Sequence, residues 1–287
     1  MITTVINAFI NGAMYGSFWG IIAIGFTLVF GVMNYVNFAQ GFFVLIMAYL
    51  SYFLFVSMGL DPFISLVFIV PLSFALGMLF YKYLGAPVIK DPHSTHIALT
   101  IGVCFFIQNF ILLIAGADMR SAVTAYTSST FNFGPIIISY SRLLASIASI
   151  ITIILLFIVM RSTDIGKSMR AAADNRKGAL IVGIHVERVY MIAFGLSTVI
   201  AGIAGTTMIP FYLMSPASGM EFLTKAFAAV IIGGLGSIPG AVIGGLIIGI
   251  VESLAAVFFK ASLGNSFTCL IMILVLIFKP NGLFGDD

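Results

Sequence analysis

The stretch KAFAAVIIGGLGSIPGAVIGG, residues 225–245, decides how this chain folds. Two apolar runs of helical character flank a short segment rich in glycine, with Gly233, Gly234, Gly236 and Pro239. Glycine and proline interrupt helices, because one adds backbone freedom and the other lacks an N–H donor. In lipid, backbone outside a helix is tolerated only where it is buried in protein or lines a wet cavity. The stretch therefore predicts a broken helix if its surroundings are lipid.

The composition shows that lipid is the solvent. Of the 287 residues, 61% are hydrophobic and 8% are charged, and the mean hydropathy is +1.18. A soluble domain carries about 25% charged residues, so this chain lacks the polar surface that a water-facing globule needs. The apolar segments are continuous and do not alternate every second residue, which favours helices over a barrel. A soluble enzyme and a nucleic-acid binder are excluded.

The chain has room for eight or nine membrane spans, since a helix needs roughly 20 apolar residues to cross the hydrocarbon. We expect them at 12–32, 41–58, 63–84, 97–115, 142–160, 191–209, 222–235, 240–259 and 266–278. The segment 222–235 is short enough to be a half-helix. The N-terminal residues contain no basic region or cleavage site, so no removable signal peptide is expected. The sequence predicts one all-α integral membrane domain over 1–287, a polytopic bundle with broken or half-helix segments.

The basic residues predict the orientation, because Lys and Arg are retained on the cytoplasmic side. Six of the thirteen lie in the connection 161–190, which is therefore expected in the cytoplasm. Counting back through two spans places Lys82 and Lys90 on the same side and the connection 116–141 outside. If all nine segments cross, the N-terminus is outside.

The 161–190 connection contains an Ala-rich stretch that predicts a short helix ending near Gly183. Such a helix below a bundle rests on lipid headgroups or docks a cytoplasmic partner, and composition does not choose between the two. The glycines at 12, 16 and 20, and at 236, 240 and 244, are spaced by four residues. In lipid, that spacing is typical of close helix packing, with gating flexibility as the alternative.

Polar residues interrupt the apolar pattern in both halves of the chain. In GVMNYVNFAQG, residues 31–41, three amide side chains do so, and Thr100 lies in the fourth span. Interrupted segments in both halves point to a transport pathway. The predicted lining of that pathway is Asn34, Asn37, Gln40, Thr100, Gly233, Gly234, Gly236 and Ser237.

Several other sequence patterns do not indicate a catalytic, nucleotide-binding or metal-binding site. Gly166-Lys167-Ser168 ends like a phosphate-binding loop, but Arg161 occupies the position of the required first glycine, so no ATP site is expected. His93 and His96 are interpreted as a solvated turn, and the two cysteines as buried apolar side chains. No metal or other cofactor is predicted. The expected spans contain neither Asp nor His, which argues against an enzyme.

Glu252 is the one carboxylate inside an expected span, and Lys225 lies near the outer start of the preceding segment. Each is interpreted either as an interhelical hydrogen-bonding group or as part of a polar solute path. A stand-alone secondary transporter that uses the Glu252 carboxylate is one rival hypothesis, and a purely structural membrane subunit is another.

Four stretches together resemble the permease subunits of branched-chain amino-acid ABC importers, the LivH-type family. They are FTLVFGVMNYVNFAQG, IGKSMRAAADNRKGALIVGIHVERV, KAFAAVIIGGLGSIPGAVIGG and FKPNGLFG, and they run nearly end to end. The resemblance implies an ABC importer permease in the bacterial cytoplasmic membrane, carrying amino acids with hydrophobic side chains. It also implies three kinds of protein partner: a second homologous permease, two cytoplasmic ATPases and an extracytoplasmic solute-binding protein. Membrane lipid is a further expected partner, and no nucleic-acid partner is expected.

The resemblance further implies that the 161–190 helix is a coupling helix against an ATPase. The matching residues are Gly166, Arg170, Ala171, Ala172, Asp174, Asn175, Gly178, Ala179, Gly183 and Ile184. One departure is Gln40, where the family usually has His; Gln cannot become charged near neutral pH. The sequence therefore defines the class of transporter more closely than the transported solute, and urea, other amides or small aromatic acids are alternative solutes.

Overall fold

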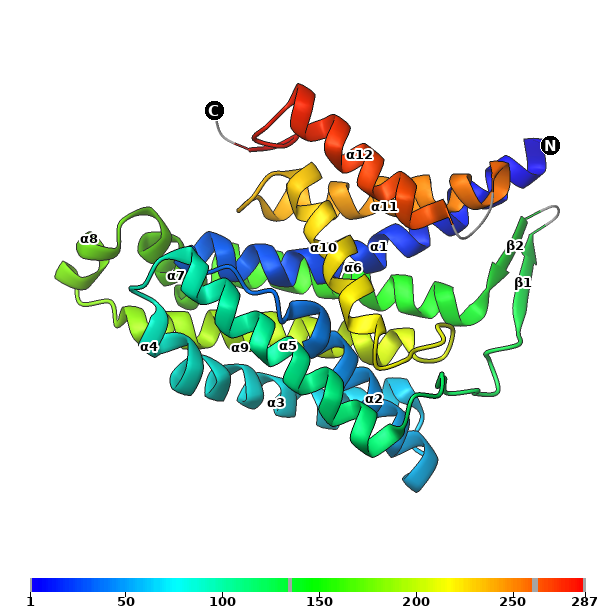
Figure 1. The fold of residues 1–287 in the computed structure, drawn as a ribbon, viewed down its shortest axis with the longest axis horizontal. Helices are drawn as coiled ribbons and strands as arrows, with labels where there is room; N and C mark the ends of the chain where they lie inside the picture. The colour runs from blue at the N-terminus through cyan, green and yellow to red at the C-terminus, as the bar shows by residue number, and fades with distance from the viewer. Residues whose placement is uncertain (1, 134–135, 260–262, 286–287) are drawn as a thin grey trace.

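The computed structural model describes residues 2–133, 136–259 and 263–285, and this part of the chain is a bundle of helices (Figure 1). Its helices are α1 (Ile2–Met33), α2 (Gln40–Met58), α3 (Pro62–Phe80), α4 (Ala86–Val88), α5 (His93–Ala115), α6 (Tyr140–Ser162), α7 (Asp164–Asp174), α8 (Arg176–Ile181), α9 (Val186–Met208), α10 (Ser218–Gly233), α11 (Ile238–Phe258) and α12 (Gly264–Phe278). A π-helical turn, η1 (Tyr81–Gly85), continues α3 into α4. The all-α prediction is confirmed for the membrane region.

The number of full-length spans is smaller than the eight or nine predicted. Within the described residues, seven helices are long and apolar enough to cross a membrane. The predicted half-helix corresponds to α10, with 16 residues, and the last predicted span to α12, with 15. Neither reaches the roughly 20 residues that a perpendicular crossing needs.

One short sheet departs from the helical pattern. Strands β1 (Thr130–Phe133) and β2 (Ile136–Ser139) form an antiparallel hairpin in the predicted outer connection, with Thr130 opposite Ser139. The β-branched run at 136–138 favours a strand. Asn7 of α1 accepts a 3.0 Å hydrogen bond at its side-chain oxygen from the Ile137 amide, which attaches the hairpin to the start of α1.

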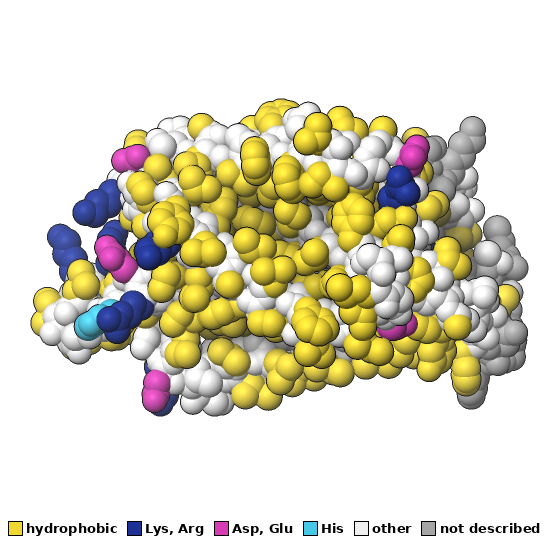
Figure 2. Space-filling view, turned by 90° about the horizontal axis from the view of Figure 1, so that it is seen from below, with side chains coloured by type: hydrophobic (Ala, Val, Ile, Leu, Met, Phe, Trp, Pro, Cys, Tyr) yellow, Lys and Arg dark blue, Asp and Glu magenta, His cyan; other side chains and the backbone are white. Residues whose placement is uncertain are grey.

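The two ends of the bundle differ in charge. Helices α7 and α8 lie at one end, and the hairpin and the N-terminus lie at the other (Figure 1). Lys and Arg side chains gather at the α7–α8 end in the view of Figure 2. The positive-inside rule assigns this end to the cytoplasm. We call it the cytoplasmic end, and the hairpin end the outer end.

Helix α1 occupies the centre and packs most closely on α11. A Cβ added at Gly16 would lie 2.6 Å from the Cα of Leu246, and one at Gly12 would lie 2.7 Å from the Cα of Ile250. Real side chains do not tolerate such distances, so the two backbones touch through glycine. The predicted close packing is confirmed, and its partner helix lies within this chain.

Both predicted helix breaks are present. The chain leaves helical geometry at 34–39, between α1 and α2, and again at 234–237, between α10 and α11. Asn34 has φ +53° and Gly236 has φ +90°, so each break contains a left-handed residue. Gly31 lies beside the second break, where a Cβ would sit 3.3 Å from the Gly236 carbonyl oxygen. The first break therefore begins next to the second.

Candidate functional site

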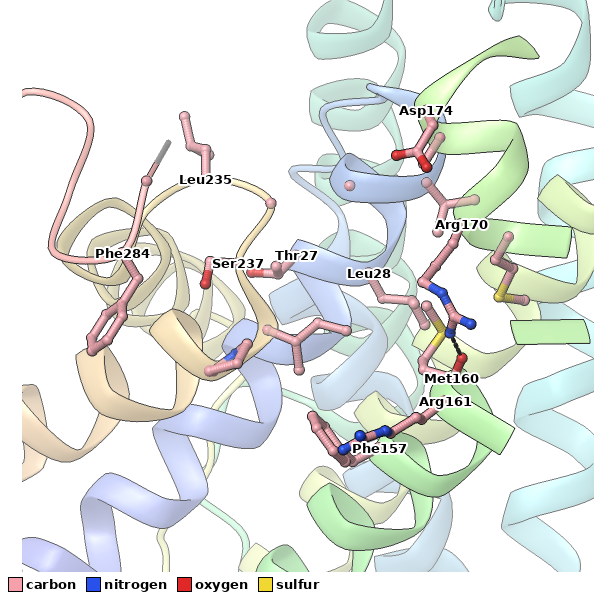
Figure 3. A pocket seen from close by; sticks show the side chains of 18 residues that line it. Thr27, Leu28, Phe157, Met160, Arg161, Arg170, Asp174, Leu235, Ser237 and Phe284 are labelled. Carbon is pink, nitrogen blue, oxygen red and sulfur yellow. Dashed lines mark hydrogen bonds between the residues drawn. The ribbon is translucent and has the colours of Figure 1, made fainter. Parts of the chain in front are cut away.

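A pocket of about 880 Å³ opens at the cytoplasmic end between four parts of the chain (Figure 3). Helix α1 contributes Thr27, the α6–α7 region contributes Arg161, and the α10–α11 turn contributes Ser237. The C-terminal segment adds Phe284. We call this space the cytoplasmic pocket. It brings together elements that are far apart in the sequence.

Two predicted sets of residues meet in the cytoplasmic pocket. Arg170 and Asp174, predicted to couple to an ATPase, line one side, and Ser237, predicted to line a pathway, lies across from them (Figure 3). Gly236, also predicted to line the pathway, contributes to the same lining. The Arg170 guanidinium donates to the backbone carbonyl of Met160, which fixes α7 to the end of α6 (Figure 3). The structure therefore connects the predicted coupling segment to the predicted broken helix through one cavity.

The predicted coupling helix is two helices. Thr163 caps α7 by accepting from the Gly166 amide at 3.1 Å, and Asn175 caps α8 by accepting from the Gly178 amide at 2.9 Å. Asn175 ends α7 because its backbone is extended, with φ −151° and ψ 97°. The predicted stop is confirmed, since Gly183 has φ +85° just after α8.

The predicted coupling residues divide between two faces. Gly166, Ala172 and Ala179 are buried, whereas Arg170, Asp174 and Asn175 are exposed. The C-terminal end of α8 forms an apolar tip that was not among the predicted coupling residues. It consists of Leu180, Ile181 and Val182. The Ile181 side chain is 86% exposed. The sequence did not predict the exposure of the tip, because three consecutive apolar residues near the end of a helix are usually buried.

The first break is held together by buried side chains. The Gln40 amide donates to the Ser197 carbonyl of α9 at 3.2 Å, and the Ser197 hydroxyl donates to the Gly25 carbonyl of α1 at 2.7 Å. The Asn37 amide lies 3.4 Å from the Gln40 side-chain oxygen. Gln40 is completely buried. These groups tie α1, α2 and α9 together inside the bundle.

Thr100 and Asn34, two other predicted pathway residues, differ in their burial. The Thr100 hydroxyl is buried, donates to the His96 carbonyl at 2.8 Å and accepts from the Phe38 amide at 3.3 Å. It therefore supports the first break from α5. Asn34 is exposed at the end of α1. A pathway role for the predicted residues of the first half stays a prediction.

His96 corrects one interpretation. It was expected with His93 in a solvated turn, but the two residues begin helix α5, and only His93 is exposed. The His96 ring stacks on Tyr35 with centroids 4.4 Å apart, and its Nε2 lies 2.8 Å from the Val88 carbonyl oxygen. The interpretation of His96 was wrong because its partners come from the α1–α2 break and α4, which local sequence does not reveal.

Lys225 forms a buried ion cluster with two carboxylates. Its Nζ lies 2.7 Å from Glu221 Oε1 on the same helix and 2.6 Å from Glu252 Oε1 on α11. The ammonium also lies 4.5 Å from the centroid of the Trp19 ring. Only 4% of the Lys225 side chain is exposed. The sequence singled out Lys225 and Glu252 separately, and the structure pairs them.

Tyr212, in the connection before α10, supports this cluster. Burial raises the pKa of its phenol, and the negative charge of the neighbouring Glu221 and a hydrogen bond to it raise the pKa further. The phenol is therefore neutral near pH 7 and can donate its proton to the carboxylate. We refer to Glu221, Lys225 and Glu252 as the ion cluster.

The C-terminal segment closes the end of α10. The Leu283 amide donates to the Ile232 carbonyl at 2.9 Å, and the Phe284 amide donates to the Gly233 carbonyl at 3.0 Å. The last carbonyls of a helix lack partners within the helix, so this segment satisfies two of them. In the sequence, residues 278–285 were notable only as part of the family resemblance.

The long apolar helices with one basic end define a multi-pass membrane protein. Two helix breaks and a cavity at the basic end are features that transport proteins share. The profile of the family "Branched-chain amino acid transport system / permease component" matches residues 8–277. The chain belongs to this family. It is therefore a multi-pass protein of the cytoplasmic (inner) membrane and a transport subunit, and the expectation that it is not an enzyme is confirmed.

The relatives match almost end to end. The high-affinity branched-chain amino acid transport system permease protein LivH of Salmonella typhimurium is 31% identical over 289 residues, covering 96% of this chain and 94% of its own. BraD of Pseudomonas aeruginosa is 28% identical over 293 residues, covering 96% and 94%. A probable LivH of Methanocaldococcus jannaschii is 30% identical over 292 residues, covering 97% and 92%. No solved structure matches the chain significantly.

Proposed function

We propose that this chain forms one half of the membrane pathway of an ATP-driven importer for branched-chain amino acids. A second, homologous permease supplies the other half, two cytoplasmic ATPases bind below, and a solute-binding protein delivers the substrate at the outer end. The family membership and the names of the full-length relatives support the substrate class.

The observation that carries this proposal is the position of the α7–α8 segment. It presents the exposed apolar tip Leu180, Ile181 and Val182 at the basic end of the bundle. An exposed apolar group rimmed by charged residues is typical of a protein interface. The tip therefore suits the groove of an ATPase, and the Lys and Arg side chains around it set the register of docking.

In this proposal, motion of the ATPases is transmitted to the pathway through α7 and α6. The buried face of α7 approaches α6 so closely that a Cβ at Gly166 would collide with the backbone carbonyls of Val159 and Met160. Displacing α7 must therefore move the end of α6 with it. Both helices line the cytoplasmic pocket together with the α10–α11 turn. In this proposal the pocket changes shape with each ATP cycle and switches access to the cytoplasm.

Affinity purification of the tagged chain from its native membranes tests the assembly. Mass spectrometry is expected to identify a second hydrophobic permease and ATPases in stoichiometric amounts. The purified assembly in proteoliposomes, with the binding protein outside and ATP inside, is expected to accumulate leucine. Recovery of the chain alone with gradient-driven uptake would support a stand-alone transporter instead.

The Ile181→Asp variant tests the docking surface. A charge at the centre of a desolvated contact costs roughly 2 kcal/mol or more, so we expect ATPase recovery to fall about 30-fold. Val123→Asp is the matched control, because Val123 is equally apolar and 73% exposed but lies in the outer connection. Equal ATPase recovery with both variants would remove the tip from the interface.

A further inference from the structure

Helix α10 separates two neighbouring pockets of opposite chemistry. The first, about 290 Å³, lies between α2, α5 and α10, and its lining includes Phe42, Cys104, Phe105 and Phe227. We call it the apolar pocket. The second, about 190 Å³, lies between α10 and α12, with Met220, Glu221, Thr224, Lys225, Asn265 and Thr268. We call it the outer polar pocket.

The two pockets share part of their lining on α10. Met220 and Thr224 line both of them, and both residues are exposed on the surface of α10. The Thr224 hydroxyl donates to the Met220 carbonyl of its own helix at 2.8 Å, which leaves its oxygen free to accept. A molecule with one apolar end and one polar end can therefore occupy both pockets across Thr224.

The outer polar pocket favours a cation. Glu221 and Lys225 line this pocket, and Glu252, which pairs with Lys225 from α11, brings the sum of the three formal charges to one net negative charge. Only 4% of the Lys225 side chain is exposed, against 32% of the Glu221 side chain, so the Glu221 carboxylate is the more accessible of the two charged groups in the pocket. Glu252 Oε2 is buried and finds no hydrogen-bond partner among the described residues. In a low-dielectric site such a charge attracts an ammonium group strongly.

The apolar pocket favours a short aliphatic group. No charged residue contributes to its lining, and Gln108 is the one amide there. Its volume lies near the lower end of the roughly 300–1,000 Å³ range of small-molecule sites. A branched aliphatic side chain gains about 0.8 kcal/mol for each CH₂ that leaves water for such a pocket.

We propose that these two pockets form the membrane binding site for the transported amino acid. Its aliphatic side chain occupies the apolar pocket and its α-ammonium group binds the Glu221 carboxylate. The Asn265 amide, on the opposite wall, can donate to the substrate carboxylate. This inference rests on the proposed function, since it takes the substrate class from there and places it beside α10.

An aminophospholipid presents the same chemistry, an ammonium group joined to an apolar chain. Its acyl chains far exceed the apolar pocket in length, so the confined volume favours the amino acid. The experiment below distinguishes the two.

Photo-crosslinking locates the substrate directly. The probe is a leucine analogue whose side chain carries a diazirine, irradiated with the importer assembly purified from its native membranes. We expect crosslinked peptides from α5 and α10, within 101–108 and 220–227. Excess leucine is expected to remove the crosslinks, whereas 4-methylpentanoate, which lacks the ammonium group, is not. Crosslinks located only elsewhere would overturn the proposal.

The Glu221→Gln variant tests the ammonium contact. It leaves Lys225 paired with Glu252, so the buried charges stay balanced and the fold is retained. We expect both crosslinking and leucine uptake to fall at least 10-fold. Asp91→Asn, at an exposed position between α4 and α5, is the matched control and is expected to behave as the unmodified protein.

The remaining outcomes separate the two proposals. Normal ATP-driven leucine uptake without crosslinks in these pockets would overturn the site and leave the importer intact. Absence of leucine uptake by the intact assembly would overturn both. Crosslinks that leucine does not remove, together with co-purified phosphatidylethanolamine that is lost in Glu221→Gln, would assign the pockets to lipid.

Discussion

The two helix breaks are built in opposite ways. The break between α1 and α2 is held by buried side chains, with Gln40 and Ser197 bonded to each other and to neighbouring helices. The break between α10 and α11 is held mainly by backbone: Gly233 contacts Gly240, and the C-terminal segment bonds the last carbonyls of α10. One side chain contributes, because the Ser237 hydroxyl accepts from the Gly240 amide at 3.2 Å. Only the second opens directly into the cytoplasmic pocket.

This difference assigns different tasks to the breaks. Side-chain hydrogen bonds inside the bundle fix one geometry, because an unpaired polar group there costs about 1–3 kcal/mol. Glycine backbones in contact permit small shifts without exchanging hydrogen-bond partners. We infer that the first break is a fixed support and that the second is the part which α7 displaces. The following variants test this comparison.

Gly240→Leu has the largest expected effect. A side chain at this position meets the Gly233 carbonyl, so α10 and α11 must separate at the second break. We expect a loss of about 3 kcal/mol or more, with little folded protein recovered. Gly102→Leu is the control, because nothing lies within 4 Å of a Cβ at Gly102. Thermal unfolding in detergent measures both, and an unchanged midpoint for Gly240→Leu would contradict the backbone contact.

Gln40→Leu is expected to have the next largest effect on stability. It leaves the Asn37 amide without the Gln40 oxygen as acceptor and removes the bond from the Gln40 amide to the Ser197 carbonyl, at a cost of about 2 kcal/mol. The same measurement is expected to show a clearly lower midpoint. Asn109→Leu serves as control, since Asn109 is exposed and, among the described residues, its side chain bonds only the Phe105 carbonyl of its own helix. Equal stability of the two variants would mean that side chains do not hold the first break.

Gly236→Ala and Asn34→Gly have the smallest expected effects, and the effect of Asn34→Gly is the smaller of the two. Both positions are left-handed, where a Cβ costs about 1–2 kcal/mol. Space is open around Gly236, so Gly236→Ala tests backbone strain alone and is expected to lower stability by about 1 kcal/mol. Asn34→Gly is expected to change it by no more than about 0.5 kcal/mol, because Asn tolerates this conformation. A stabilised Gly236→Ala would show that the second break adopts another backbone geometry.

The membrane class, the approximate positions of the spans, both breaks and the basic end could all be predicted from the sequence. These features are local: an apolar run of about 20 residues must cross lipid, and glycine and proline interrupt helices wherever they stand. The four-residue glycine spacing also predicted a packing face, since residues four apart share one side of a helix. The family resemblance then supplied the importer class.

The tertiary structure alone decided which distant residues meet. Lys225 pairs with Glu252, His96 stacks on Tyr35, and Leu283 bonds the end of α10. It also turned Ala172 toward the bundle and left Ile181 exposed. Each of these outcomes depends on the rotation and depth of helices that are far apart in the chain. A single sequence carries no local signal for such relations, because they arise from packing between surfaces rather than from periodicity within one helix.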